Sequence, residues 1–173
     1  MKYLIAIVAL ALALSTGFSG ENIKVYFSPD GGCTDAVVAA LGQAKSTVFV
    51  QAYSFTSAPI AKALVDAHKR GVKVTVILDK SQRSERYSSA TFLHNAGVPT
   101  FIDSKHAIAH NKVMVVDGKT VITGSFNFTK AAETSNAENL LVISDPVVAA
   151  KYSANADSHL KHSEAYTEKV STK

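Results

Sequence analysis

The chain has 173 residues, of which 47% are hydrophobic, and a formal net charge of +4. These values exclude a disordered or fibrous chain and favour one globular domain with a real core. The mildly basic balance permits a polyanionic partner but does not demonstrate one. Cys33 is the only cysteine, which excludes an intramolecular disulfide, and no Cys/His pairing pattern indicates thiol catalysis.

The first twenty residues have the pattern of a secretory signal. A short basic start at residues 1–3 precedes an apolar run at 4–14 and then a stretch of small residues. Such a run is too short to cross a bilayer, which needs about 20 residues. Residues 1–20 are therefore predicted to be a cleaved signal peptide, with the mature protein in the periplasm or secreted; an N-terminal membrane anchor is the alternative. Residues 21–173 are predicted to be a single domain with no stable membrane insertion.

Strand-like runs then alternate with helical patterns. Strands are predicted at 23–27, 47–55, 72–78, 98–102 and 139–143, and a hairpin joins 110–116 to 119–123. Helices are predicted at 34–44 with Thr34 as a cap, at 57–70 with Ser57 as a cap, within 81–95, and from Pro146 to about His162. This order predicts an α/β fold with a mixed β-sheet flanked by helices on both faces. The polar tail from Ser163 is expected to fray.

The chemistry is concentrated in residues 110–127, around the turn signal Asp117-Gly118. A two-residue turn would place His110 opposite Ser125, and a four-residue loop would place it opposite Asn127. Either register puts His110, Lys112, Ser125 and Asn127 on one face, whereas a three-residue loop would scatter them.

An imidazole, an ammonium, a hydroxyl and an amide together suit a phosphate group. They supply a nucleophile or acid, a cation and hydrogen-bond donors for the non-bridging oxygens. Asp117 lies seven residues beyond His110, which is roughly 20 Å along an extended strand. The predicted turn is sufficient to account for an aspartate at this position, so no catalytic role is assigned to Asp117.

The pattern His110-x-Lys112-x4-Asp117-x6-Gly124-Ser125-x-Asn127 resembles the motif of the phospholipase D superfamily. Residues 51–57 and 71–79 are also similar to that family, and the resemblance covers nearly all of the mature chain. It is strongest to the small, single-motif bacterial endonucleases of the superfamily, which are exported and resistant to chelators.

The resemblance implies a role for each motif residue. His110 would be the nucleophile on phosphorus, Lys112 and Asn127 would bind phosphate oxygens, Ser125 would support the site by hydrogen bonding, and Glu138 would orient the histidine. Asp117, Gly118 and Gly124 would be structural. Larger family members carry the motif twice, whereas this chain carries it once. A two-fold homodimer would therefore supply the second histidine as general acid.

No metal or other cofactor is expected. His106 and His110 could bind a metal if they lay on a helix, but no third ligand follows at a useful spacing and Lys112 would repel a cation. The His159-Leu-Lys161 segment lacks the rest of the motif and is interpreted as a polar helix face. His68, His94 and His162 are expected to be solvated.

The favoured function is a metal-independent, non-specific endonuclease that hydrolyses DNA, or RNA, through a phosphohistidine at a homodimer interface. Two alternatives stay open: a phospholipid phosphodiesterase of the same superfamily, and a non-enzymatic binding protein on this scaffold. The small size and the lack of an amphipathic basic segment weigh against the first. Competent side chains at every motif position weigh against the second.

Overall fold

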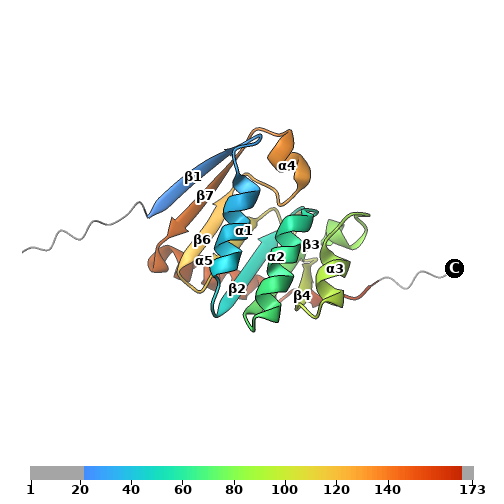
Figure 1. The fold of residues 1–173 in the computed structure, drawn as a ribbon. Helices are drawn as coiled ribbons and strands as arrows, with labels where there is room; N and C mark the ends of the chain where they lie inside the picture. Colours follow the sequence, from blue (N-terminus) through green and yellow to red (C-terminus); the bar gives the residue numbers. More distant parts are fainter. Residues whose placement is uncertain (1–21, 169–173) are drawn as a thin grey trace, which may run out of the picture.

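A single sheet organises the molecule, whose computed structural model describes residues 22–168. The predicted signal peptide therefore lies outside the described residues. Within them the sheet has eight strands in the order β1-β7-β6-β5-β2-β3-β4-β8 (Figure 1). The strands are β1 (Ile23–Ser28), β2 (Thr47–Ala52), β3 (Lys73–Asp79), β4 (Thr100–Asp103), β5 (Lys112–Val116), β6 (Thr120–Gly124), β7 (Glu138–Ser144) and β8 (Glu164–Ala165). β2 and β4 run parallel to β3, and all other neighbouring pairs are antiparallel.

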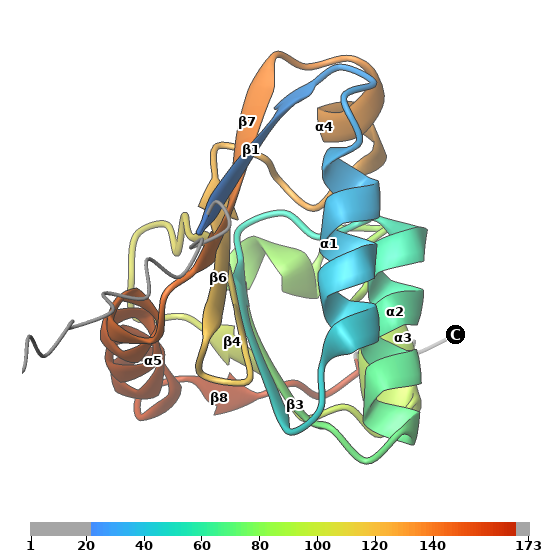
Figure 2. The ribbon, with the colours of Figure 1, turned by 60° about the vertical axis from the view of Figure 1, so that its left-hand side comes forward.

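Helices cover both faces of this sheet. They are α1 (Cys33–Gln43), α2 (Ala58–Lys69), the 3-10 helix η1 (Lys80–Arg83), α3 (Ala90–Asn95), α4 (Lys130–Thr134) and α5 (Pro146–Leu160). Figure 2 shows α1, α2 and α3 on one side of the sheet and α5 on the other. The predicted α/β class, a mixed sheet flanked by helices on both faces, is confirmed. Among residues 22–168, no helix has the length and apolar character needed to cross a bilayer.

The core has two parts because the central strands are covered on both faces. The larger cluster lies under α1, α2 and α3 and takes Met114 and Val116 from β5. The smaller one lies under α5 and takes Val113 and Val115 from the same strand. Strand β5 is buried along its whole length for this reason, as is typical of a strand with helices on both sides. It is also the strand that begins with the motif residue Lys112, directly after the loop that carries His110.

The capping residue predicted for α1 is wrong. The N-cap of α1 is Gly32, at a φ of 80°, rather than Thr34. The carboxylate of Glu133 in α4 accepts hydrogen bonds from the backbone N–H groups of Gly32 and Thr34, at 3.1 and 2.6 Å. A side chain about a hundred residues away in the chain therefore caps this helix, which local spacing does not reveal.

The segment after Ser163 does not fray within the described residues. β8 pairs with β4 through Phe101↔Ala165 and Ile102↔Glu164. The following Tyr166 is buried, and its hydroxyl lies 2.7 Å from that of Thr91 in α3. The pairing of β8 with β4 and the contact between Tyr166 and Thr91 hold this polar segment in place, although its sequence predicted fraying.

Candidate active site

The β5–β6 hairpin has a three-residue loop, so both predicted registers are wrong. The ladder pairs Val116 with Thr120 and Val113 with Thr123. Asp117 and Gly118 both adopt positive φ, at 54° and 62°, and the N–H of Lys119 donates to the carbonyl of Val116. One extra residue in the loop shifts the pairing by one position. By ladder parity, Lys112 and Ser125 therefore do not share a face of the sheet.

The side chains of the motif nevertheless line one open hollow of about 540 Å³. Its lining comprises His110, Asn111, Lys112, Val113, Thr123, Gly124, Ser125, Asn127, Glu138 and Tyr152. They meet because the β5–β6 ladder stops short of the motif. Beyond Gly124, the N–H groups of Ser125 and Phe126 both bond to the carbonyl of Asn139, as in a β-bulge. The bulge changes the direction of the chain at this point. The side chain of Lys112 is long enough to reach the hollow from its buried strand.

Gly124 is required by this bulge. Its φ is 150°, and a Cβ at this position would overlap the backbone carbonyl of Asn139. The structural role expected for Gly124 thus has a local cause, namely the close approach of β6 to β7.

His110 and Lys112 are in direct contact. The ammonium Nζ of Lys112 lies 3.0 Å from Nε2 of His110 and donates to the carbonyl oxygen of His110 at 2.9 Å. The Tyr53 ring lies beside both, 5.1 Å from Nζ and 4.6 Å from the imidazole centroid. An ammonium has only donors, so Nε2 must present its lone pair and the ring proton must sit on Nδ1. That tautomer is the one in which Nε2 is nucleophilic.

The electrostatics of Lys112 are set by its burial. The residue is 7% exposed. Burial lowers the pKa of its ammonium, and the carboxylate of Glu138 partly opposes this by raising the pKa. The hollow therefore holds a positive charge that is weakly solvated.

Ser125 and Asn127 complete the polar lining. Ser125 Oγ accepts hydrogen bonds from the backbone N–H and the side-chain amide of Asn139, at 3.1 and 3.3 Å. Its own proton is left to donate to a ligand. The Oδ1 atom of Asn127 is buried and has no hydrogen-bond partner among residues 22–168. A half-turn of this amide would present an N–H donor at the same point.

Glu138 lines the hollow, but its carboxylate bonds to a residue other than His110. Its Oε1 accepts from the side-chain amide of Asn136 at 3.3 Å. Among residues 22–168 it makes no hydrogen bond to the His110 ring, so the structure does not show the orienting role that the resemblance implies.

Asp117 is a clamp between the hairpin and β2. Its carboxylate accepts from the backbone N–H groups of Lys45, Ser46 and Thr47 and from the Ser46 hydroxyl, at 2.8–2.9 Å. Burial opposes ionisation, but these four hydrogen bonds outweigh it and lower the pKa of Asp117 to about 2. It does not line the hollow.

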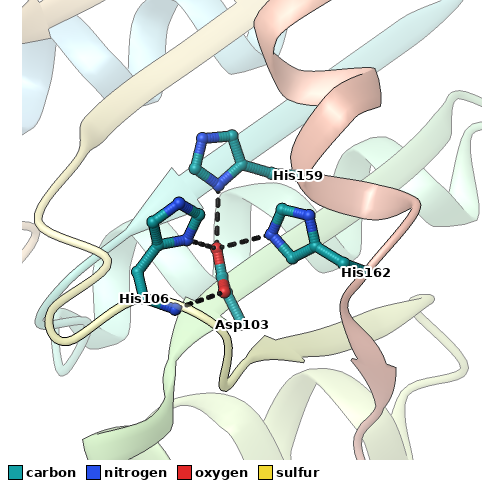
Figure 3. Close-up of side chains that lie close together, drawn as sticks. All are labelled: Asp103, His106, His159 and His162. Carbon is teal, nitrogen blue, oxygen red and sulfur yellow. Dashed lines mark hydrogen bonds and ion pairs between the residues drawn. The ribbon is translucent and has the colours of Figure 1, made fainter.

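The structure gathers a second group of titratable side chains that the sequence analysis missed. His106, His159 and His162 surround the buried carboxylate of Asp103 (Figure 3). Burial disfavours the charged carboxylate, yet bonds from the three imidazoles hold the pKa of Asp103 well below its usual range. His162 is therefore not the solvated side chain that was expected, and His159 belongs to this cluster rather than to a merely polar helix face. The local spacings Asp-x2-His at 103–106 and His-x2-His at 159–162 were the available signal.

Comparison with known proteins identifies the family. The family model described as "Cardiolipin synthase, PLD-like domain" matches residues 37–160. A "Phospholipase D" of Rickettsia typhi is 42% identical over 137 residues, which are 79% of this chain and 67% of that protein. A "Mitochondrial cardiolipin hydrolase" of Xenopus laevis is 36% identical over 123 residues, 71% of this chain and 58% of that protein.

Solved structures agree with this assignment. Nuc from Salmonella typhimurium, a phospholipase D family member, matches with a TM-score of 0.80 and 41% identity, covering 84% of this chain and 98% of Nuc. NucT from Helicobacter pylori matches with a TM-score of 0.78 at 24% identity, covering 83% and 98%, and shares the fold. Together with the motif and the hollow that it lines, these matches show that the chain belongs to the phospholipase D superfamily, as a phosphodiester hydrolase that carries the motif once.

Proposed function

We propose that this protein is an endonuclease that hydrolyses DNA through a phosphohistidine on His110, with no metal ion at the reacting phosphate. The observation that carries the proposal is the contact between the Lys112 ammonium and Nε2 of His110 at the edge of a polar, open hollow. It combines a nucleophilic nitrogen with a positive charge for the phosphate oxygens. Lysine thereby takes the electrostatic role that a metal ion has in other phosphodiesterases.

The reaction runs in two balanced steps. In the first, Nε2 of His110 forms a bond to phosphorus, the bond from phosphorus to the leaving sugar oxygen breaks, and an imidazolium donates its proton to that oxygen. In the second, water attacks phosphorus, the same imidazole accepts a proton from the water, and the phosphorus–nitrogen bond breaks. Lys112, Ser125 and Asn127 donate hydrogen bonds to the non-bridging oxygens throughout.

The second imidazole is proposed to be His110 of the partner subunit in a homodimer. An exposed apolar stripe supports this: Ile23, Val25 and Phe27 on the edge strand β1 are 50, 51 and 65% exposed. Val25 pairs with Leu141, and Leu141 pairs with Thr123, which lines the hollow. Directly paired residues share a sheet face. The stripe therefore lies on the same face as the hollow, where a two-fold contact can join two hollows into one site.

The polarity of the hollow favours nucleic acid over lipid. Most lining side chains are polar and His110 is exposed, so a solvated phosphodiester backbone fits better than a phosphate attached to acyl chains. The 41% identity to Nuc supports the same choice.

A phospholipid phosphodiesterase is the second candidate. The relatives from Rickettsia are named phospholipase D, and others are named cardiolipin hydrolases. The stripe at Ile23, Val25 and Phe27 is also a surface that a lipid layer could contact.

One paired assay separates the two candidates. The mature chain is incubated in excess EDTA with supercoiled plasmid and, separately, with vesicles containing labelled anionic phospholipid. We expect nicked and linear plasmid and intact lipid, with no product from folded His110→Asn. Lipid cleavage without plasmid cleavage would favour the phospholipid phosphodiesterase over the endonuclease. If the folded wild-type chain cleaves neither substrate, both candidate functions are rejected.

Export is proposed on the pattern of residues 1–20. The protein recovered from the periplasm or medium should begin between residues 18 and 21. N-terminal sequencing that starts at Met1 would refute cleavage.

A further inference from the structure

A compact group of metal-ligand side chains lies outside the hollow. Asp103 ends β4, His106 follows in the next loop, His159 lies in the last turn of α5, and His162 comes just after it (Figure 3). Their ligand atoms all lie within 4.8 Å of one another. The Asp103 side chain is fully buried, and those of His159 and His162 are 14% and 22% exposed. None of the four lines the hollow around His110.

The contacts within this group are unusually crowded for hydrogen bonds alone. Nδ1 of His159, Nδ1 of His106 and Nε2 of His162 lie 2.8, 2.9 and 3.3 Å from one atom, Oδ2 of Asp103. The other oxygen, Oδ1, is turned away toward the backbone N–H groups of Lys105 and His106. A single carboxylate oxygen offers about two lone-pair sites, so three N–H donors exceed its capacity. Three nitrogens and an oxygen that converge on one small volume are the geometry of a coordination shell.

We propose that Asp103, His106, His159 and His162 bind one divalent transition-metal ion, with zinc as the reference ion, in a closed four-ligand structural site. Three imidazoles and one carboxylate form a nitrogen-rich set that suits zinc and its neighbours, whereas magnesium and calcium prefer oxygen ligands. A tetrahedron with bonds of about 2.0–2.2 Å has ligand separations of roughly 3.3–3.6 Å. The oxygen–nitrogen distances of 2.8–3.3 Å are slightly shorter, and small side-chain rotations would open them around an ion.

Binding changes the protons of the group in a defined way. Each histidine presents the lone pair of its inward nitrogen to the ion and carries its remaining proton on the outward nitrogen. Asp103 stays ionised and contributes one oxygen. Any proton that an inward nitrogen shared with Asp103 is released to solvent or moves to the outward nitrogen.

The position of the site indicates what the ion does. His159 and His162 are 56 and 59 residues from Asp103 in the chain, so the ion would cross-link the end of α5 to the loop between β4 and β5. That loop carries His110 two residues before β5 begins. It is otherwise held by Lys80, whose ammonium donates to the carbonyl of His106 at 3.1 Å, and by Asp79, which accepts from the N–H of Ala109 at 2.7 Å. Four protein ligands leave no open position, so the ion holds the loop in place and takes no part in the reaction.

The test uses the full mature chain, purified without a polyhistidine tag because such a tag binds the same ions. After dialysis against a chelator, calorimetric titration with zinc chloride should give one site per chain. Saturating zinc should raise Tm by roughly 5–10 °C, and magnesium should have no effect. Absence of zinc binding at millimolar concentration would overturn the proposal and leave a hydrogen-bonded histidine–aspartate cluster.

Variants locate the ion. His159→Gln and His162→Gln keep a side-chain donor for Asp103 but remove the imidazole, and each should weaken zinc binding at least about tenfold. His68→Gln is the matched control, since His68 lies in α2 on the opposite side of the sheet (Figure 2). Equal zinc affinity in all three variants would place the ion elsewhere and reject the site.

Activity separates this inference from the proposed function. The zinc-free chain should still cleave plasmid at 25 °C in EDTA while melting at a lower temperature than the zinc-bound chain. Loss of cleavage in a zinc-free chain that remains folded would show that the ion is catalytic, contrary to the structural role assigned here.

Discussion

The ammonium of Lys112 touches His110 twice, 3.0 Å from its Nε2 and 2.9 Å from its carbonyl oxygen. Two residues that are separated by one position thus form a closed unit in which the lysine holds the ring and selects its tautomer. In the proposed mechanism, phosphate binding and the tautomer of the nucleophile both depend on this ammonium, so loss of its charge should affect both.

Removing the nucleophile should abolish turnover and leave the fold intact. His110 is exposed, so His110→Asn should keep the wild-type Tm and lower kcat at least about 10³-fold. Lys112→Met preserves the buried stem and should also lose activity, through lost phosphate binding. Steady-state cleavage of a fluorescent oligonucleotide and a thermal melt measure the two effects. More than a tenth of wild-type activity in folded His110→Asn would contradict the assignment.

The decline of kcat/KM at alkaline pH should follow the deprotonation of Lys112. As pH rises through its pKa, the ammonium loses its proton and with it the charge that we propose binds phosphate. Burial lowers this pKa from the ordinary 10.5, so kcat/KM should decline at a pH below that value. The Glu138 carboxylate raises the pKa of Lys112, so Glu138→Gln should move this decline to lower pH. A decline that stays in place or moves to higher pH would contradict this coupling.

The clamp at Asp117 should contribute stability that depends on pH. Asp117→Asn keeps a residue that tolerates the positive φ but loses the ionised acceptor, and we expect a loss of about 1–3 kcal/mol in the free energy of unfolding at pH 7. The pKa of Asp117 is about 2 in the folded chain, against about 3.9 in an unfolded one. The stabilisation is therefore complete above pH 4 and declines as pH falls toward 2. Urea denaturation at pH 7 and pH 3 should show a smaller difference between wild type and variant at pH 3.

Two glycines of the hairpin should respond differently to alanine. Gly118 has a φ of 62° with open space around its Cα, so Gly118→Ala should cost only about 1–2 kcal/mol of backbone strain. At Gly124 a Cβ would overlap the Asn139 carbonyl, so Gly124→Ala should be more destabilising and should displace Ser125. Chemical denaturation with kinetics on the folded fraction tests both. Equal losses of stability and normal turnover in Gly124→Ala would argue against the bulge as a positioning device.

The dimer proposal makes a quantitative prediction for mixed subunits. If one site uses His110 from both chains, a heterodimer of wild type and His110→Asn is nearly inactive. An equal mixture after full exchange should then keep about a quarter of wild-type activity by random pairing. A value of one half would mean that each chain works alone, and a monomeric mass in light scattering at assay concentration would contradict the proposal directly.

Most of the elements, and the motif, were predictable from the residue pattern alone. Apolar and β-branched runs located the strands β1 to β7, and apolar residues at helical spacing located α2. Helix-start signals, such as Pro146 at the beginning of α5, indicated α1 and α5. Six motif positions at fixed spacing pointed to the superfamily that the comparisons confirm. The short helix α4 and the strand β8 leave no such pattern, and neither was predicted.

The way in which the side chains meet depends on contacts between segments that are distant in the chain. The loop at 117–119 is one residue longer than its Asp-Gly signal suggested, and the bulge after Gly124 arises from contact with β7. Glu133 caps a helix about a hundred residues away, and Asp103 gathers histidines from both ends of a 60-residue stretch. These relationships depend on pairing between distant segments, whose free energy comes from the packed core as a whole. The spacing of residues in the sequence indicates the helix or strand to which a residue belongs. It does not indicate which distant residue will contact that residue in the folded chain.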